Sequence, residues 1–181
     1  MKLTLILGPM KSGKSMDLIG TFAPYAYTDR PFALFQPLRN VRDERIHTRN
    51  GIHCEARKVE SLKEALGKGY FAVGVDEIHM FPPEEADVVA RLLAEGTRVV
   101  ACGLDTDPWG ELFRIVKRLL ELGPDDVRYK RAACDGCRSL DAVYTQVLHH
   151  GEPVGRDVPP CLPDDGTYSY KALCRECFVR K

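Results

Sequence analysis

One octapeptide near the start of the chain reads Gly8-Pro9-Met10-Lys11-Ser12-Gly13-Lys14-Ser15. It matches in full the pattern G-x-x-x-x-G-K-[ST], in which glycines let backbone N–H groups turn inward and cradle phosphate oxygens. An apolar run at 3–7 precedes it and a helical stretch at 14–27 follows, so it stands between a predicted strand and a predicted helix. We expect Lys14 to reach the β- and γ-phosphates and Ser15 to bind Mg²⁺. The alternative is a glycine turn with an incidental lysine.

Apolar runs alternate with helical stretches through the first two thirds of the chain. We expect strands at 32–35, 52–59, 71–75 and 98–102, and helices at 61–67, 82–95 and 110–122. Pro24 should end or kink the first helix, and Ser61 with Glu64 suggests a capping box. Such alternation is typical of βαβ units. It predicts an α/β, P-loop NTPase-like fold with a mostly parallel sheet flanked by helices.

Two adjacent carboxylates, Asp76 and Glu77, end the apolar run at 71–75. In phosphate-loop enzymes a carboxylate on another strand helps to hold Mg²⁺. Neighbouring strand residues point to opposite sides, so one carboxylate can serve the metal while the other faces a substrate hydroxyl as general base. The alternative is a solvated acidic pair at a strand end. His79, just beyond, either touches a ligand or packs as an ordinary histidine.

Two CxxC pairs stand late in the chain, Cys134 with Cys137 and Cys174 with Cys177. Together they supply four thiolates, the number that a closed tetrahedral Zn²⁺ site requires. Residues 138–173 separate the pairs, which is more than a compact zinc ribbon has, so a hairpin and a loop are expected between them. The alternatives are a redox pair and free core cysteines.

Length and charge narrow the class of protein. A chain of 181 residues suits one large domain with a small appendage, and we place the boundary near Asp125, giving domains at 1–124 and 125–181. The net charge of +0 argues against a nucleic-acid polymer as main ligand. No apolar run approaches the roughly 20 residues that span a bilayer, and the apolar start is too short for a signal peptide. We therefore expect a cytoplasmic protein.

The order of these motifs resembles the zinc-containing thymidine kinase family, the type found in bacteria and in animal cytosol. The resemblance covers nearly the whole chain and rests on residues 8–15, Phe35-Gln36-Pro37, Asp76-Glu77, Cys102-Gly103-Leu104-Asp105, Cys134/Cys137, and Tyr170 with Cys174-Arg175-Glu176-Cys177. It implies transfer of the ATP γ-phosphoryl group to the 5′-hydroxyl of a deoxynucleoside, thymidine first, with Glu77 as proton acceptor. Asp76 would complete the Mg²⁺ site, and a homotetramer is implied because members are usually tetramers.

The resemblance also implies which residues touch each ligand. On the ATP side these are residues 8–15 together with Asp76, Glu77, Ile78 and His79. On the nucleoside side they are Met10, Arg42, Met80, Phe113 and Tyr170. A lasso loop at 153–170, tied to the zinc cysteines, would cover the nucleoside and read the edge of its base with backbone groups.

Departures from the family pattern all fall on the nucleoside side. Met80 replaces an aromatic residue, Asn40 replaces an aspartate, and Pro108 stands where a phenylalanine is expected. The lasso is also longer and lacks paired glycines. Because the ATP side and the cysteines are intact, we predict a kinase with altered or relaxed acceptor specificity. The alternative is a nucleotide-binding homologue without kinase turnover.

Overall fold

The computed structural model describes residues 2–40, 46–47, 53–162 and 165–179. A six-stranded sheet in the order β5-β2-β6-β7-β1-β8 forms its centre, and every neighbouring pair of strands is parallel. In chain order the strands are β1 (Leu3–Leu7), β2 (Phe32–Pro37), β5 (Arg57–Val59), β6 (Ala72–Val75), β7 (Arg98–Gly103) and β8 (Asp126–Tyr129). The α/β fold and the mostly parallel sheet are confirmed.

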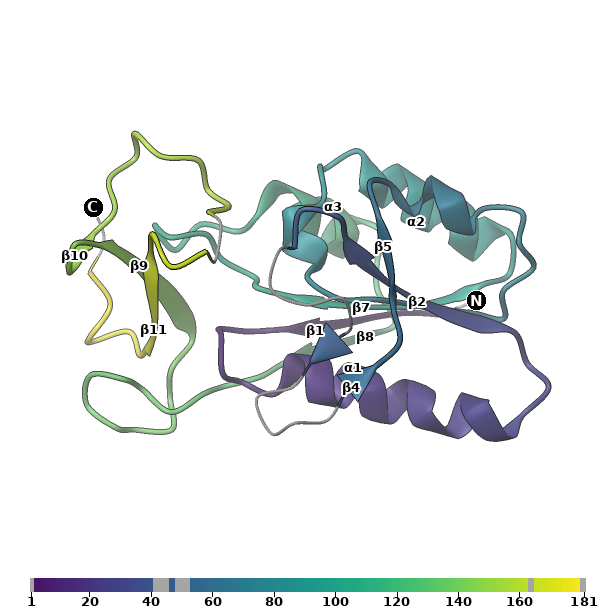
Figure 1. Ribbon diagram of the computed structural model, residues 1–181, viewed down its shortest axis with the longest axis horizontal. Helices are drawn as coiled ribbons and strands as arrows, with labels where there is room; N and C mark the ends of the chain where they lie inside the picture. The colour runs from purple at the N-terminus through teal and green to yellow at the C-terminus, as the bar shows by residue number, and fades with distance from the viewer. Residues whose placement is uncertain (1, 41–45, 48–52, 163–164, 180–181) are drawn as a thin grey trace.

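Helices cover both faces of this sheet (Figure 1). One face carries α1 (Lys14–Phe22), and the other carries α2 (Glu85–Ala94) and α3 (Arg114–Glu121). Side chains of β1 alternate between the faces, so Leu5 and Leu7 join the cluster under α2 and α3, whereas Ile6 joins the cluster under α1. All three are wholly buried. Burial on both faces explains why the strand reads as an unbroken apolar run.

Local chemistry sets the helix ends. Helix α1 ends at Phe22 and continues as the 3₁₀ turn η1 (Ala23–Tyr27), with Pro24 in its first turn, as its missing N–H predicts. Helix α3 begins at Arg114, later than the predicted start at 110. The cause is Asp107, whose Oδ1 accepts the N–H groups of Trp109 at 2.9 Å and Glu111 at 3.0 Å and holds a turn there.

The segment predicted as a capped helix at 61–67 is the 3₁₀ turn η2 (Leu62–Ala65). Ser61 caps it by accepting the Lys63 N–H at 3.2 Å. The second half of the predicted capping box is different. Glu85 of α2, buried beneath the turn, accepts the Ser61 hydroxyl at 2.6 Å and the Leu62 N–H at 2.8 Å. A carboxylate distant in sequence therefore holds the start of this turn, through the Ser61 hydroxyl and the Leu62 N–H.

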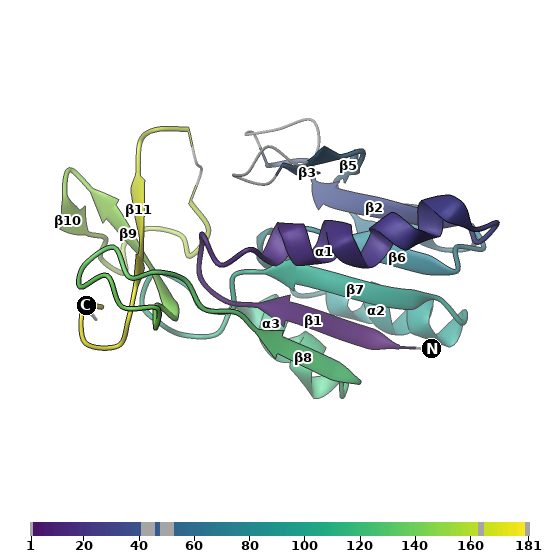
Figure 2. The same cartoon turned by 90° about the horizontal axis from the view of Figure 1, so that it is seen from below.

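A smaller antiparallel sheet, β10-β9-β11, lies beyond the carboxyl edge of the main sheet (Figures 1 and 2). Its strands are β9 (Tyr144–His149), β10 (Glu152–Pro153) and β11 (Ser169–Leu173). His150 and Gly151, with φ of 50° and 85°, make the predicted hairpin turn. Since β8 belongs to the main sheet, that sheet extends past residue 124 to Tyr129.

Two further strands, β3 (Ile46–His47) and β4 (His53–Cys54), pair with each other near β5. In the part of the chain that the structure describes, no helix has the length and apolarity needed to cross a membrane.

Candidate active site

The octapeptide of residues 8–15 forms the loop between β1 and α1, at the carboxyl edge of the sheet. Gly8 has φ of 143°, and a Cβ there would lie 2.4 Å from the Lys130 carbonyl oxygen. Gly13, with φ of 79°, immediately precedes α1. Both glycines are therefore required by the backbone. The N-terminus of α1 follows the loop directly, and a helix N-terminus is a favourable place for an anion.

The lysine of this loop is held close to it. Lys14 Nζ donates to the Pro9 carbonyl at 2.6 Å, and the Ser12 hydroxyl donates to the same oxygen at 2.7 Å. Burial lowers the pKa of Lys14, while the charges of Glu77 and Asp76 act in the opposite direction. The ammonium group is thus bound to the loop backbone and lies within the electrostatic influence of two carboxylates.

Asp76 follows β6 and is 5% exposed. One of its oxygens, Oδ1, accepts from the Ser15 hydroxyl at 3.2 Å, the Cys102 thiol at 2.9 Å and the Glu77 N–H at 3.0 Å. Burial and then the charge of Glu77 raise the pKa of Asp76 to about 6. Ser15 and Asp76 place a hydroxyl and a carboxylate side by side, and such hard oxygen ligands fit Mg²⁺.

Glu77 has φ of 50° and precedes the 3₁₀ turn η3 (Ile78–Met80). This left-handed conformation, uncommon outside glycine, turns the chain sharply after the strand. The Glu77 carboxylate lies 3.5 Å from His79 Nδ1, and the same nitrogen accepts the Leu104 N–H at 3.3 Å. Glu77 and His79 are therefore neighbours just beyond the carboxyl end of β6.

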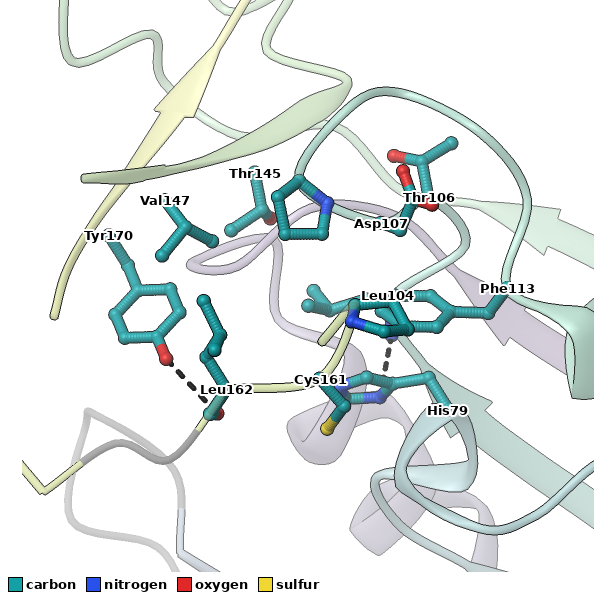
Figure 3. A pocket seen from close by; sticks show the side chains of 12 residues that line it. His79, Leu104, Thr106, Asp107, Phe113, Thr145, Val147, Cys161, Leu162 and Tyr170 are labelled. Carbon is teal, nitrogen blue, oxygen red and sulfur yellow. Dashed lines mark hydrogen bonds between the residues drawn. The ribbon is translucent and has the colours of Figure 1, made fainter. Parts of the chain in front are cut away.

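A pocket opens beside this pair (Figure 3). Its walls come from η3, the 104–113 segment, β9, the loop after β10 and β11: His79, Leu104, Thr106, Asp107, Pro108, Phe113, Thr145, Val147, Pro160, Cys161, Leu162 and Tyr170. The rings of His79 and Phe113 lie 4.9 Å apart. At the other end, the Tyr170 hydroxyl donates to the Leu162 carbonyl at 3.1 Å. The pocket is mostly apolar with a few polar groups, as sites for small molecules usually are.

The structure brings together some of the expected nucleoside residues and not others. Phe113 and Tyr170 line the pocket, and so does His79, which the resemblance assigns to the ATP side. Met10 packs instead against the cluster around the C-terminal cysteines, and Met80 is absent from the pocket wall. Arg42 lies outside the described residues. Ile78, expected near ATP, is wholly buried in the cluster under α2 and α3.

Sequence reasoning missed several wall residues. Thr145 and Val147 are two apart on β9, so they share one face of the strand, and this alternation was the signal that could have found them. Cys161 and Leu162 belong to a long loop whose sequence carries no periodic signal.

The four late cysteines converge. Their sulfur atoms all lie within 4.8 Å of one another, and those of Cys137 and Cys174 are 3.7 Å apart. Zn–S bonds of about 2.3 Å in a tetrahedral site place sulfurs about 3.8 Å apart, so the cluster could hold a zinc ion. Partial desolvation acts to raise the pKa of Cys134, but backbone N–H groups of Cys137, Cys174 and Gly136 outweigh it and lower that pKa to about 6. A thiolate is the form that binds zinc.

A glycine loop leading from a sheet strand into a helix, with its serine against a buried aspartate of another strand, defines a nucleotide-binding protein of the P-loop class. The sequence matches the thymidine kinase family model over residues 1–178. It is 34% identical to a thymidine kinase of Thermococcus kodakarensis over 184 residues, covering 96% of this chain and 92% of that protein. It is also 34% identical to a thymidine kinase of Pyrobaculum aerophilum over 185 residues, covering 98% of each.

The chain therefore belongs to the thymidine kinase family, and it is a phosphotransferase of that type. The family uses ATP. The family resemblance expected from the order of the sequence motifs is confirmed.

Proposed function

We propose that the chain transfers the γ-phosphoryl group of ATP to the 5′-hydroxyl of a deoxynucleoside, with thymidine as the first candidate. The observation that carries this proposal is the position of Glu77. Its carboxylate is 3.5 Å from His79, which lines the pocket, and its charge acts on the buried Lys14 of the phosphate loop. A carboxylate between a phosphate site and an acceptor pocket can take the proton from the attacking hydroxyl.

The other residues have supporting roles in this proposal. Backbone N–H groups of residues 8–15 and the ammonium group of Lys14 bind the ATP phosphates. Ser15 and Asp76 hold Mg²⁺, which when bound neutralises charge that develops on the transferred phosphoryl group. Phe113 and Tyr170 hold the nucleoside base, and the loop at 153–170 covers it. Cys161 and Leu162 of the same loop also form part of the pocket wall, and in this proposal they bear on the choice of base.

The variant Glu77→Gln tests the role of the base. We expect kcat to fall by about 100- to 10,000-fold, the range that a positioned general base contributes. The affinity for ATP should change far less than kcat, because Gln keeps the size of the side chain, although the charge that acts on Lys14 is lost. Exposed Glu84, on the surface just before α2, gives the matched control Glu84→Gln, which should leave kcat unchanged. ADP release with a panel of deoxynucleosides, and the mass of the product, are the measurements.

Absence of a phosphorylated nucleoside from every member of the panel, with a folded wild-type protein, would contradict the proposal.

One observation favours a second candidate, a nucleotide-binding homologue without kinase turnover. Asn40 stands where the family has an aspartate, and its buried amide donates to Gln36 Oε1 at 3.2 Å. Tight ATP binding without acceptor-stimulated ADP release would support that candidate.

We further propose a cytoplasmic homotetramer, with a nucleotide-binding domain and a small zinc domain that carries the lasso. The resemblance supports the tetramer, and the net charge of +0 supports a protein whose main ligand is not a nucleic acid. The lack of an apolar run of about 20 residues supports one that does not span a membrane. Light scattering coupled to gel filtration tests the assembly, and a mass corresponding to a single chain would contradict it. Metal analysis tests the zinc.

A further inference from the structure

The side chain of Lys11 leaves the phosphate loop and reaches the first cysteine pair. Its Nζ lies 2.8 Å from each carboxylate oxygen of Asp135, the residue that follows Cys134. This is a two-point contact between the loop and the turn that holds two of the four metal-binding sulfurs. The two residues are distant in sequence, and neither is needed to complete the metal cluster or the pocket.

Asp135 is itself fixed from a second side. Its N–H donates to the Ala172 carbonyl at 2.7 Å, and its Oδ2 accepts the Ala172 N–H at 2.7 Å. Asp135 is thus tied to β11 through both backbone and side chain, while Cys134 and Cys137 flank it in the sequence. A carboxylate held in this way is a rigid anchor for a lysine.

The backbone of Lys11 has an unfavourable conformation that a fixed side chain can help to maintain. Its φ of 64° is left-handed, which costs free energy in any residue with a Cβ. The peptide groups around this residue belong to the loop whose N–H groups cradle phosphate. A side chain clamped at two points favours the strained conformation over relaxed ones. Without the clamp, the same backbone would spend more time in shapes that point its N–H groups elsewhere.

A second contact supports the same arrangement. The Met10 N–H donates to the Thr145 hydroxyl of β9 at 3.0 Å, and the Met10 side chain packs against the cluster that includes Cys134 and Cys174. Two consecutive loop residues are therefore held by the C-terminal part of the chain.

We propose that Asp135 is a positioning residue of the nucleotide site. Acting through Lys11, it holds the phosphate loop in its binding shape and links that shape to the metal held by the cysteines. The inference rests on the proposed function in so far as ATP is the ligand of this loop.

The variants Asp135→Asn and Lys11→Met test the link with little change of size. The asparagine amide keeps an oxygen for the Ala172 N–H, so β11 retains its partner. The control is Asp141→Asn, which removes an exposed ion pair with Arg131 in the same part of the chain, a pair that involves neither Lys11 nor Asp135. Amide hydrogen exchange of residues 10–13, without nucleotide, should accelerate several-fold in both test variants and stay unchanged in the control.

ATP affinity, measured by calorimetry with a non-hydrolysable analogue, should weaken by about three- to tenfold in each single variant. Since both act through one contact, the double variant should bind about as weakly as either single variant. In turnover assays KM for ATP should rise while KM for the nucleoside and kcat stay within about twofold, a pattern that general loss of structure would not give. By linkage, zinc affinity in competition with a chelator should rise when the analogue is bound, and less so in Asp135→Asn.

Unchanged exchange in residues 10–13 would overturn the inference, and so would additive losses of ATP affinity in the double variant. Tighter ATP binding by Asp135→Asn would also overturn it, because Lys11 would then contact the phosphates directly and Asp135 would compete. The exchange measurement needs no nucleotide. Failure of the wild type to bind ATP would therefore count against the proposed function while the exchange data still decide the role of Asp135.

Discussion

Asp76 gathers three donors on one carboxylate oxygen, from Ser15, Cys102 and the Glu77 N–H. Its pKa nevertheless rises to about 6, because burial and the charge of Glu77 outweigh the hydrogen bonds. If Asp76 binds Mg²⁺ as proposed, a proton competes with the ion for this carboxylate below about pH 6. Mg²⁺ affinity should fall as the pH falls through that value, since the protonated carboxyl group is a poor ligand.

The thiol of Cys102 gives a test at this scale. Its hydrogen bond acts to lower the pKa of Asp76, so Cys102→Ala should raise that pKa further and move the acid limb of Mg²⁺-dependent activity to higher pH. Cys102→Ser keeps a donor and is the matched control. The measurement is kcat/KM against pH at limiting Mg²⁺, supported by an NMR titration of the carboxyl group. Identical acid limbs in all three proteins would contradict the prediction.

Among the elements, β6 depends on a glycine. A Cβ at Gly74 would lie 2.5 Å from Leu34 Cδ2 and 2.8 Å from Phe22 Cε2, and both of these side chains are buried. Gly74→Ala should therefore lower the free energy of unfolding by about 1–3 kcal/mol through overpacking between β6 and α1. Exposed Gly20 of α1 has no atom within 4 Å of an added Cβ, so Gly20→Ala should be neutral or stabilising. Denaturant unfolding of both variants checks this, and equal stabilities would contradict it.

Local sequence predicted the elements wherever the residues of one segment are enough to determine its backbone conformation. Buried strands such as β1 and β7 are visible as apolar runs, and Pro24 marks the end of α1. The start of α3 was missed because Asp107 holds a turn through side-chain contacts that no periodicity reveals. The carboxylate that binds Ser61 was misassigned to Glu64 for a similar reason, since Glu85 reaches Ser61 only after α2 has packed against the turn.

At the scale of the whole molecule, three hydrophobic clusters divide the chain. Two sandwich the main sheet, and a smaller third one surrounds the cysteines. Because the third cluster is small, we expect the C-terminal sheet to depend on metal. Chelation, or Cys137→Ser, should remove about one zinc ion per chain and expose β9 and β11 to proteolysis while β1 and β7 stay protected. Cys54→Ser is the control, since Cys54 lies outside the cysteine cluster. Equal protection of both sheets without zinc would contradict this.

The sequence predicted the phosphate-binding half of the candidate site better than the pocket. Residues 8–15 and the pair Asp76 and Glu77 occupy consecutive positions, so their chemistry can be read from a short pattern. The pocket joins η3, β9, β11 and two loops, and its wall exists only after these have packed. Contacts between the phosphate loop and the C-terminal part of the chain, such as Lys11 with Asp135, cannot be predicted from the sequence of either segment alone.

The uniform direction of the main sheet has a practical consequence. Every strand of the main sheet ends at the edge where the phosphate loop and the pocket lie. Strand β1 therefore begins, at Leu3, at the opposite end of the sheet (Figure 2). An affinity tag or a surface linker attached ahead of Leu3 would thus hold the protein by its far end. With the protein immobilised in this orientation, the catalytic edge would face the solution, which suits a chip-based assay of nucleoside capture.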